Sequence, residues 1–183
     1  IYDRESSLKH FYNGRGQVAQ SILPPGVKGH LATYKSPYQY SKSRAKELLE
    51  QAGFPGGKGL PIFNLELSNQ NQWSRQMGEF VKNQLKEIGI NIRIVTNSWP
   101  RFNEKLRKKK ADLFQMSWTA DYPDAQSFFQ LFYSKNISPG INSTNFSNKE
   151  FDRIYQKRRN TQSLSISKNL DKKMLDILSR ELP

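Results

Sequence analysis

The sequence has 183 residues, with 29 Lys or Arg against 16 Asp or Glu, so its formal net charge is +13. It contains no cysteine and two histidines, His10 and His30, which excludes disulfides and thiolate metal sites and leaves too few imidazoles for a histidine-based metal site. No run approaches the roughly 18 apolar residues of a membrane-spanning helix. The positive charge favours either association with polyanions, such as nucleic acid or anionic lipid, or a plain solvated surface.

The first 40 residues are predicted to be mostly irregular. A short helix is expected over residues 1–13, and residues 21–40 are rich in proline, glycine and tyrosine without any period. A further helix is expected over "SKSRAKELLEQAG" (41–53), capped by Ser41 or Ser43. A turn-rich connector, "FPGGKGLP", follows it.

The middle of the chain alternates between strand and helix patterns. Strands are predicted over 62–67, 90–95 and 111–118, with helices over 71–89 and from Ser98 onwards. This order is typical of βαβ units and predicts an α/β fold with a mostly parallel sheet flanked by helices. Two more helices are expected around 148–160 and 164–181.

The expected domain organisation is a single α/β lobe over residues 1–183. It would consist of an irregular first segment (1–40), a βαβ core (41–135) and C-terminal helices (145–183).

Motifs for nucleotide binding or catalysis are weak in this sequence. "GRGQVA" (14–19) follows a helix pattern rather than a strand, and "GFPGGKG" lacks the glycine spacing and the Ser/Thr of a P-loop. Asp121 and Asp124 are the one close pair of carboxylates at a candidate site, but they lie on one turn rather than on opposing walls. We therefore expect no enzyme, no cofactor and no metal, with a hydrolase that uses these two aspartates as a minor alternative.

Asp121 follows the third predicted strand, which ends near Trp118. Ligands of parallel α/β sheets bind outside the carboxyl ends of the strands, so Asp121 is placed to face a ligand. Asp124 follows Pro123 and suits the N-cap of a helix over "AQSFFQLFY". A lone carboxylate at a partly desolvated edge favours a cationic group such as an amine. The alternative is that Asp121 is also a turn or capping residue.

"WTADYPDAQSFFQLFYS" resembles the signature of the peptide-binding extracytoplasmic solute-binding proteins of ABC importers (family 5, the peptide and nickel type). "YQYSKSRAKELLEQAGFPGGKGLP", "QLKEIGINIRIV" and "SPGINSTNFSNKEFDRIY" are similar to further stretches of that family, in the same order. Ser41 stands where the family has an aspartate, and the strongly basic charge is unusual for such receptors. The resemblance covers the C-terminal lobe of a longer, two-lobed protein and implies a lobe of the type II periplasmic-binding-protein kind, with three layers.

The resemblance also implies the binding chemistry. Asp121 would pair with the α-amino group of a bound peptide, the backbones of Ser117 and Thr119 would bond the extended ligand, and Trp118 would line the pocket. The implied partners are an oligopeptide or dipeptide ligand, the missing N-terminal lobe and an importer permease. The location would be periplasmic or extracytoplasmic, with a lipid anchor as an option for the full-length protein.

Two alternatives remain open at the level of sequence. The clusters "KLRKKK" (105–110) and "KRR" (157–159) favour a nucleic-acid-binding domain, although nucleic acid is not the expected partner. Within the resembled family, the ligand could instead be nickel or another small solute.

Overall fold

A computed structural model describes residues 2–182 and divides them into two compact units. The first comprises residues 2–18 and 38–117, and the second comprises residues 19–37 and 118–182. The expected single lobe, with segments at 1–40, 41–135 and 145–183, stays a prediction.

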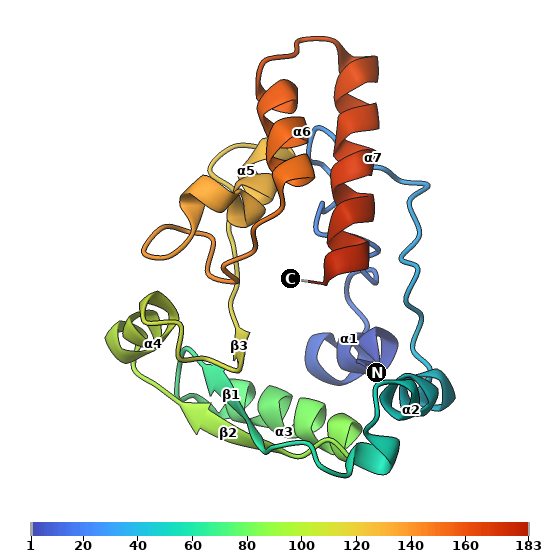
Figure 1. Ribbon diagram of the computed structural model, residues 1–183, viewed down its shortest axis with the longest axis vertical. Coiled ribbons are helices and arrows are strands. Elements are labelled where there is room, and N and C mark those ends of the chain that lie inside the picture. Colours follow the sequence, from blue (N-terminus) through green and yellow to red (C-terminus); the bar gives the residue numbers. More distant parts are fainter. Residues whose placement is uncertain (1, 183) are drawn as a thin grey trace. The chain divides into compact units, whose positions relative to one another are not determined.

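The first unit contains a parallel sheet of three strands in the order β2-β1-β3 (Figure 1). Every pairing in it is parallel, and Leu65 of β1 lies opposite Ile94 of β2 and Leu113 of β3. Its elements are α1 Arg4–Tyr12, α2 Lys42–Gln51, the 3₁₀ turn η1 Pro55–Gly57, β1 Phe63–Leu67, α3 Gln72–Lys86, β2 Ile92–Thr96, α4 Trp99–Arg107 and β3 Leu113–Gln115.

Helix α3 covers one face of this sheet. Asn71 caps it by accepting a hydrogen bond from the Ser74 N–H at 2.8 Å. A Cβ on Gly78 would lie 3.2 Å from side-chain atoms of Leu67 and Ile94, so the missing side chain allows the helix to approach the strands closely. The buried residues of this layer are Leu65, Leu67 and Ile92.

Helix α4 covers the opposite face. Side chains alternate along a strand, so Glu66 points away from the face that carries Leu65 and Leu67. Glu66 receives Lys105 of α4, and the ring of Phe102 on α4 meets Phe114 of β3 at 6.4 Å between centroids. The predicted class, an α/β fold with a parallel sheet flanked by helices, is confirmed.

The second unit is helical, with an irregular segment around its core. Its elements are α5 Gln126–Phe129, the 3₁₀ turns η2 Gln130–Phe132 and η3 Ser134–Asn136, α6 Lys149–Arg159 and α7 Leu164–Glu181. Helices α6 and α7 lie side by side (Figure 1). They enclose a core that includes Phe129, Phe151 and Met174, each 0% exposed.

Two predicted elements are shorter than expected. The third strand ends at Gln115 rather than at residue 118, and the helix over "AQSFFQLFY" is a single α-turn followed by 3₁₀ turns. The side-chain amides of Gln130 and Asn136 donate to the carbonyls of Ser127 and Gln130, at 3.1 and 2.9 Å. These bonds occupy carbonyls that a longer α-helix would use for its own N–H groups.

Candidate functional site

The four predicted site residues lie in one segment without regular secondary structure that follows β3. Ser117, Thr119 and Asp121 are exposed, and Trp118 is partly buried. Ser117 is the last residue of the first unit, and Trp118 begins the C-terminal stretch of the second unit. The segment therefore carries the chain from the sheet into the helical core.

The backbone of this segment has unused hydrogen-bonding groups. Among residues 2–182, no partner is found for the N–H or C=O groups of Ser117, Trp118, Thr119 or Ala120. Each residue has one backbone donor and one acceptor, so the segment has donors and acceptors that are available to a ligand. The indole Nε1–H of Trp118 is also buried without a partner in the described chain. Since buried polar groups are normally satisfied, this donor marks a place for an acceptor.

Asp121 is held by its backbone and not by its side chain. Its N–H donates to the Oγ of Ser127 at 3.2 Å. Within the described part of the chain its carboxylate makes no hydrogen bond or ion pair. The alternative that Asp121 caps a helix therefore receives no support from its contacts. Asp121 can accept a cationic group without first breaking an existing bond.

Asp124, three residues further on, has structural contacts. Its Oδ1 accepts from the Gln126 N–H at 2.9 Å, as a capping residue does, although Ala125 occupies the N-cap position of α5. The guanidinium of Arg158 contacts both carboxylate oxygens of Asp124, at 3.0 and 3.2 Å. Asp124 therefore holds the turn in place, and Asp121 is the carboxylate of this turn that has no partner within residues 2–182.

Arg158 also binds a second carboxylate. Its Nε donates to Oδ1 of Asp171 at 2.8 Å, and Asp171 is fully buried. Burial raises the pKa of Asp171 to about 6, although the neighbouring guanidinium of Arg158 acts in the opposite direction. The pKa of Arg158 is raised in turn; its burial lowers this pKa, but the two carboxylates outweigh that effect.

Sequence reasoning placed Arg158 in a basic surface cluster, and this was wrong. Arg158 is 5% exposed and shares the buried face of α6 with Phe151, Ile154 and Tyr155. The spacing of these four residues, i, i+3, i+4 and i+7, is the signal that could have placed Arg158 inside. Asp171 carries the matching signal, because it follows Leu170 on the buried stripe of α7.

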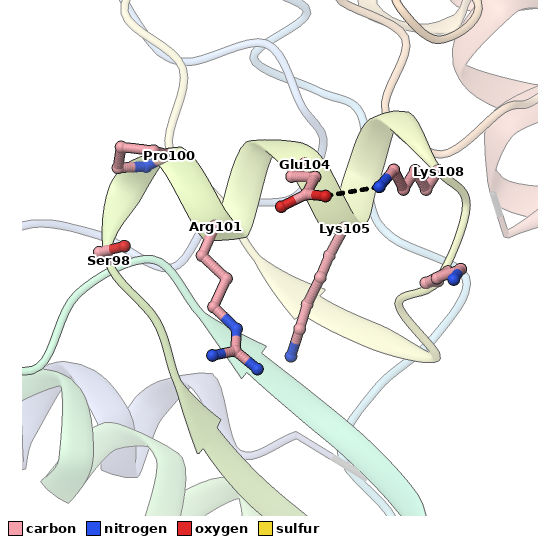
Figure 2. A pocket seen from close by; sticks show the side chains of 7 residues that line it. Ser98, Pro100, Arg101, Glu104, Lys105 and Lys108 are labelled. Atoms are coloured by element: carbon pink, nitrogen blue, oxygen red, sulfur yellow. Dashed lines mark hydrogen bonds and ion pairs between the residues drawn. The ribbon is translucent and has the colours of Figure 1, made fainter.

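A second feature of the described chain is a basic depression beside α4, in the first unit (Figure 2). Its volume is about 540 Å³, and its lining residues are Ser98, Pro100, Arg101, Glu104, Lys105, Lys108 and Lys110. Figure 2 shows Arg101 and Lys105 on the same side of the helix and the ion pair between Glu104 and Lys108. None of the four predicted site residues lines this depression.

Two classes of feature are absent from the residues that the structure describes. Over residues 2–182 there is no group of three or more His, Cys, Asp or Glu side chains that could hold a metal ion. The helices in the same range are all too short or too polar to cross a membrane.

Comparisons with known proteins agree on one family. The sequence model of the bacterial extracellular solute-binding proteins, family 5 (middle region), matches residues 1–140. The dipeptide-binding protein of Escherichia coli K12 is 26% identical over 161 residues, which are 87% of this chain and 30% of that protein. Heme-binding protein A of Haemophilus influenzae is 27% identical, over 83% of this chain and 28% of its own length.

A solved structure shows the same fold. The dipeptide-binding protein of Pseudoalteromonas sp. SM9913, in complex with Met-Leu, superposes with a TM-score of 0.87 at 28% identity, over 99% of this chain and 36% of the other. The chain thus spans about a third of the length of the proteins that it matches. The family's sequence model matches more than half of the residues of this chain. The chain therefore belongs to the bacterial extracellular solute-binding proteins of family 5.

Proposed function

We propose that this chain supplies part of the ligand site of a substrate-binding protein that delivers oligopeptides or dipeptides to an ABC importer. Membership of the family supports a binding role, and relatives named for dipeptide binding support peptides as the ligand. The proposed role is binding, because the exposed segment offers a ligand a carboxylate and unpaired backbone groups.

One observation carries the proposal: the unpaired backbone of residues 117–120 leads directly to the free carboxylate of Asp121. An extended peptide can bond this backbone as an added strand, whatever its side chains are. Its α-ammonium group would then pair with Asp121 at the end of that strand, while Trp118 lines the site. Such an arrangement fixes the peptide by its N-terminus and tolerates many sequences.

The proposal includes the partners that a complete receptor needs. The chain covers about a third of its relatives, so the rest of the receptor, including the N-terminal lobe, would complete the site. An exposed Asp121 alone would bind an amine weakly, because water screens an exposed ion pair. Closure of a second lobe would exclude water and strengthen the pair. The complete protein would work outside the cytoplasm beside its permease, whether or not a lipid anchors it there.

The test is calorimetry on the complete receptor that carries this chain, with Met-Leu and trialanine as probes. Each peptide is used with a free and with an acetylated N-terminus. Asp121→Asn is expected to weaken binding of the free peptides by about 30-fold or more, since it removes one partner of a buried charge pair. Acetylated peptides have no ammonium group, and their affinity should not change.

Glu150→Gln is the matched control, because Glu150 is an exposed carboxylate of the same unit, in the first turn of α6. It should leave both affinities unchanged. Equal affinity of wild type and Asp121→Asn for free peptides would contradict the role of Asp121. If no peptide binds the wild type, the ligand belongs to another class, such as nickel or the haem that one relative is named for.

The nucleic-acid alternative is not favoured by the ion pairs of the two basic clusters. Lys105 binds the buried Glu66, Lys108 binds Glu104, and Arg158 is inside the second unit. Of the four basic side chains that line the depression beside α4, Lys105 and Lys108 are therefore paired within the chain.

A further inference from the structure

We propose that Ser127 and Arg158 are positioning residues for Asp121, and that Asp171 acts through Arg158. Together they hold the turn of residues 121–127 so that the Asp121 carboxylate is presented in one direction to the ammonium group of the ligand. This inference rests on the proposed role of Asp121.

The first contact is direct. The hydroxyl of Ser127 accepts the backbone N–H of Asp121, and Ser127 is 0% exposed within α5. The bond joins the backbone of Asp121 to a buried residue six positions later. It therefore limits rotation of the Asp121 backbone without occupying its carboxylate.

The second set of contacts holds the middle of the turn. The N–H of Lys28 donates to the carbonyl of Pro123, and the N–H of Ala125 donates to the carbonyl of Lys28, both at 2.8 Å. Asp124 is thus flanked by two backbone bonds to the same residue, and its carboxylate receives the guanidinium of Arg158. The turn cannot shift without breaking several bonds together.

The third contact fixes Arg158 itself. The guanidinium is planar, so binding Asp171 through Nε and Asp124 through Nη2 sets its orientation completely. Little space remains around this arrangement: a Cβ on Gly29 would lie 2.5 Å from Oδ2 of Asp171 and 2.7 Å from Cβ of Ala125. Gly29 has φ +103°, a conformation that also favours glycine.

The charges of the network favour the same ligand group. One guanidinium faces two carboxylates, so the cluster of Asp124, Arg158 and Asp171 has a net negative charge when all three are ionised. This charge adds to that of Asp121 and attracts a cation arriving at the turn. A rigid, correctly directed carboxylate also loses less conformational entropy when the ligand binds.

The experiment measures, in the complete receptor, how strongly a free N-terminus is preferred over an acetylated one for Met-Leu and trialanine. Ser127→Ala should reduce this preference about fivefold, as expected for the loss of one hydrogen bond. Arg158→Lys should reduce it about tenfold, because an ammonium group cannot bind both carboxylates in the same fork. In both variants the affinity for acetylated peptides should be kept, which loss of folded protein would not allow.

Two matched controls separate positioning from general damage. Ser167→Ala removes another buried serine hydroxyl of the second unit, and Arg159→Lys alters the exposed arginine next to Arg158 on α6. Both should keep the full preference. If Asp121→Asn abolishes the preference while Ser127→Ala and Arg158→Lys retain it, the inference is overturned and the proposed function stands. If the wild type shows no preference for a free N-terminus, both are overturned.

Discussion

The two units each contain a buried ion pair that joins a helix to the segment beneath it, but the two pairs differ in charge balance. In the first unit Glu66, 3% exposed, binds Lys105 of α4 at 2.7 Å and the side-chain amide of Asn97 at 2.7 Å. One cation faces one anion, and the Lys105 side chain is still 22% exposed. Water can therefore reach part of this pair.

In the second unit Arg158 faces two carboxylates, and its side chain is 6% exposed. Burying charge is costly unless every charge is paired, and here one cation serves two anions. Oδ2 of Asp171 has no hydrogen-bond partner among the described residues. The comparison indicates that the Glu66–Lys105 pair attaches α4 to the regular sheet. The Arg158 network instead holds an irregular turn despite an unfavourable charge balance, as functional sites often do.

The largest difference between the two pairs should appear when the cation is removed. Arg158→Met takes the cation away from the buried Asp171 and the partly buried Asp124, and we expect a loss of about 3–5 kcal/mol in the free energy of unfolding. Urea denaturation followed by circular dichroism measures it. The charge argument is wrong if Arg158→Met is as stable as wild type, and Arg159→Met at the neighbouring exposed position provides the baseline.

A pH series tests the excess negative charge directly. Folding raises the pKa of Asp171 from 3.8 to about 6, so the folded state binds its proton more tightly than the unfolded state. This contribution to stability is complete below about pH 3.8 and is lost as the pH rises through about 6. The gap corresponds to about 3 kcal/mol.

The check is the difference in unfolding free energy between wild type and Asp171→Asn at pH 4, 5, 6 and 7. Wild type should lose stability relative to the variant as the pH rises. The charged groups that face Asp171 are Arg158 of α6 and Asp124 of the turn. A difference that does not vary with pH would show that Asp171 does not titrate there.

The regular parts of the first unit were predictable because their local signals agree with one another. The 71–89 helix has Asn71 as its cap, Met77, Val81 and Leu85 as an apolar stripe, and Gly89 in a left-handed conformation after its end. The sequences of β1 and β2 are rich in apolar residues, which indicates buried strands. The position of Asp121 after the third strand could also be derived from the sequence, but its role in binding stays a prediction.

The irregular parts were not predictable, because distant residues determine them. The third strand stops at Gln115, since β1 pairs with it only as far as Leu67. The turn around Asp124 depends on Lys28, Arg158 and Asp171, which lie far from it in sequence. The helical spacing of Arg158 with Phe151, Ile154 and Tyr155 indicates the buried face of α6, but the two carboxylates that pair with Arg158 could not be identified from the sequence.

The smallest expected effect distinguishes Lys105 in α4 from Lys108 at the C-cap of the same helix. Lys105→Met leaves Glu66 buried with Asn97 as its remaining side-chain partner, and we expect a loss of about 2 kcal/mol in the free energy of unfolding. This loss is smaller than the one expected for Arg158→Met, because position 105 is partly exposed and water can reach the Glu66 carboxylate there. Lys108→Met removes the exposed partner of Glu104 and should change nothing measurable. Equal losses for Lys105→Met and Arg158→Met would mean that charge balance does not distinguish the two networks, and that burial alone sets their contribution.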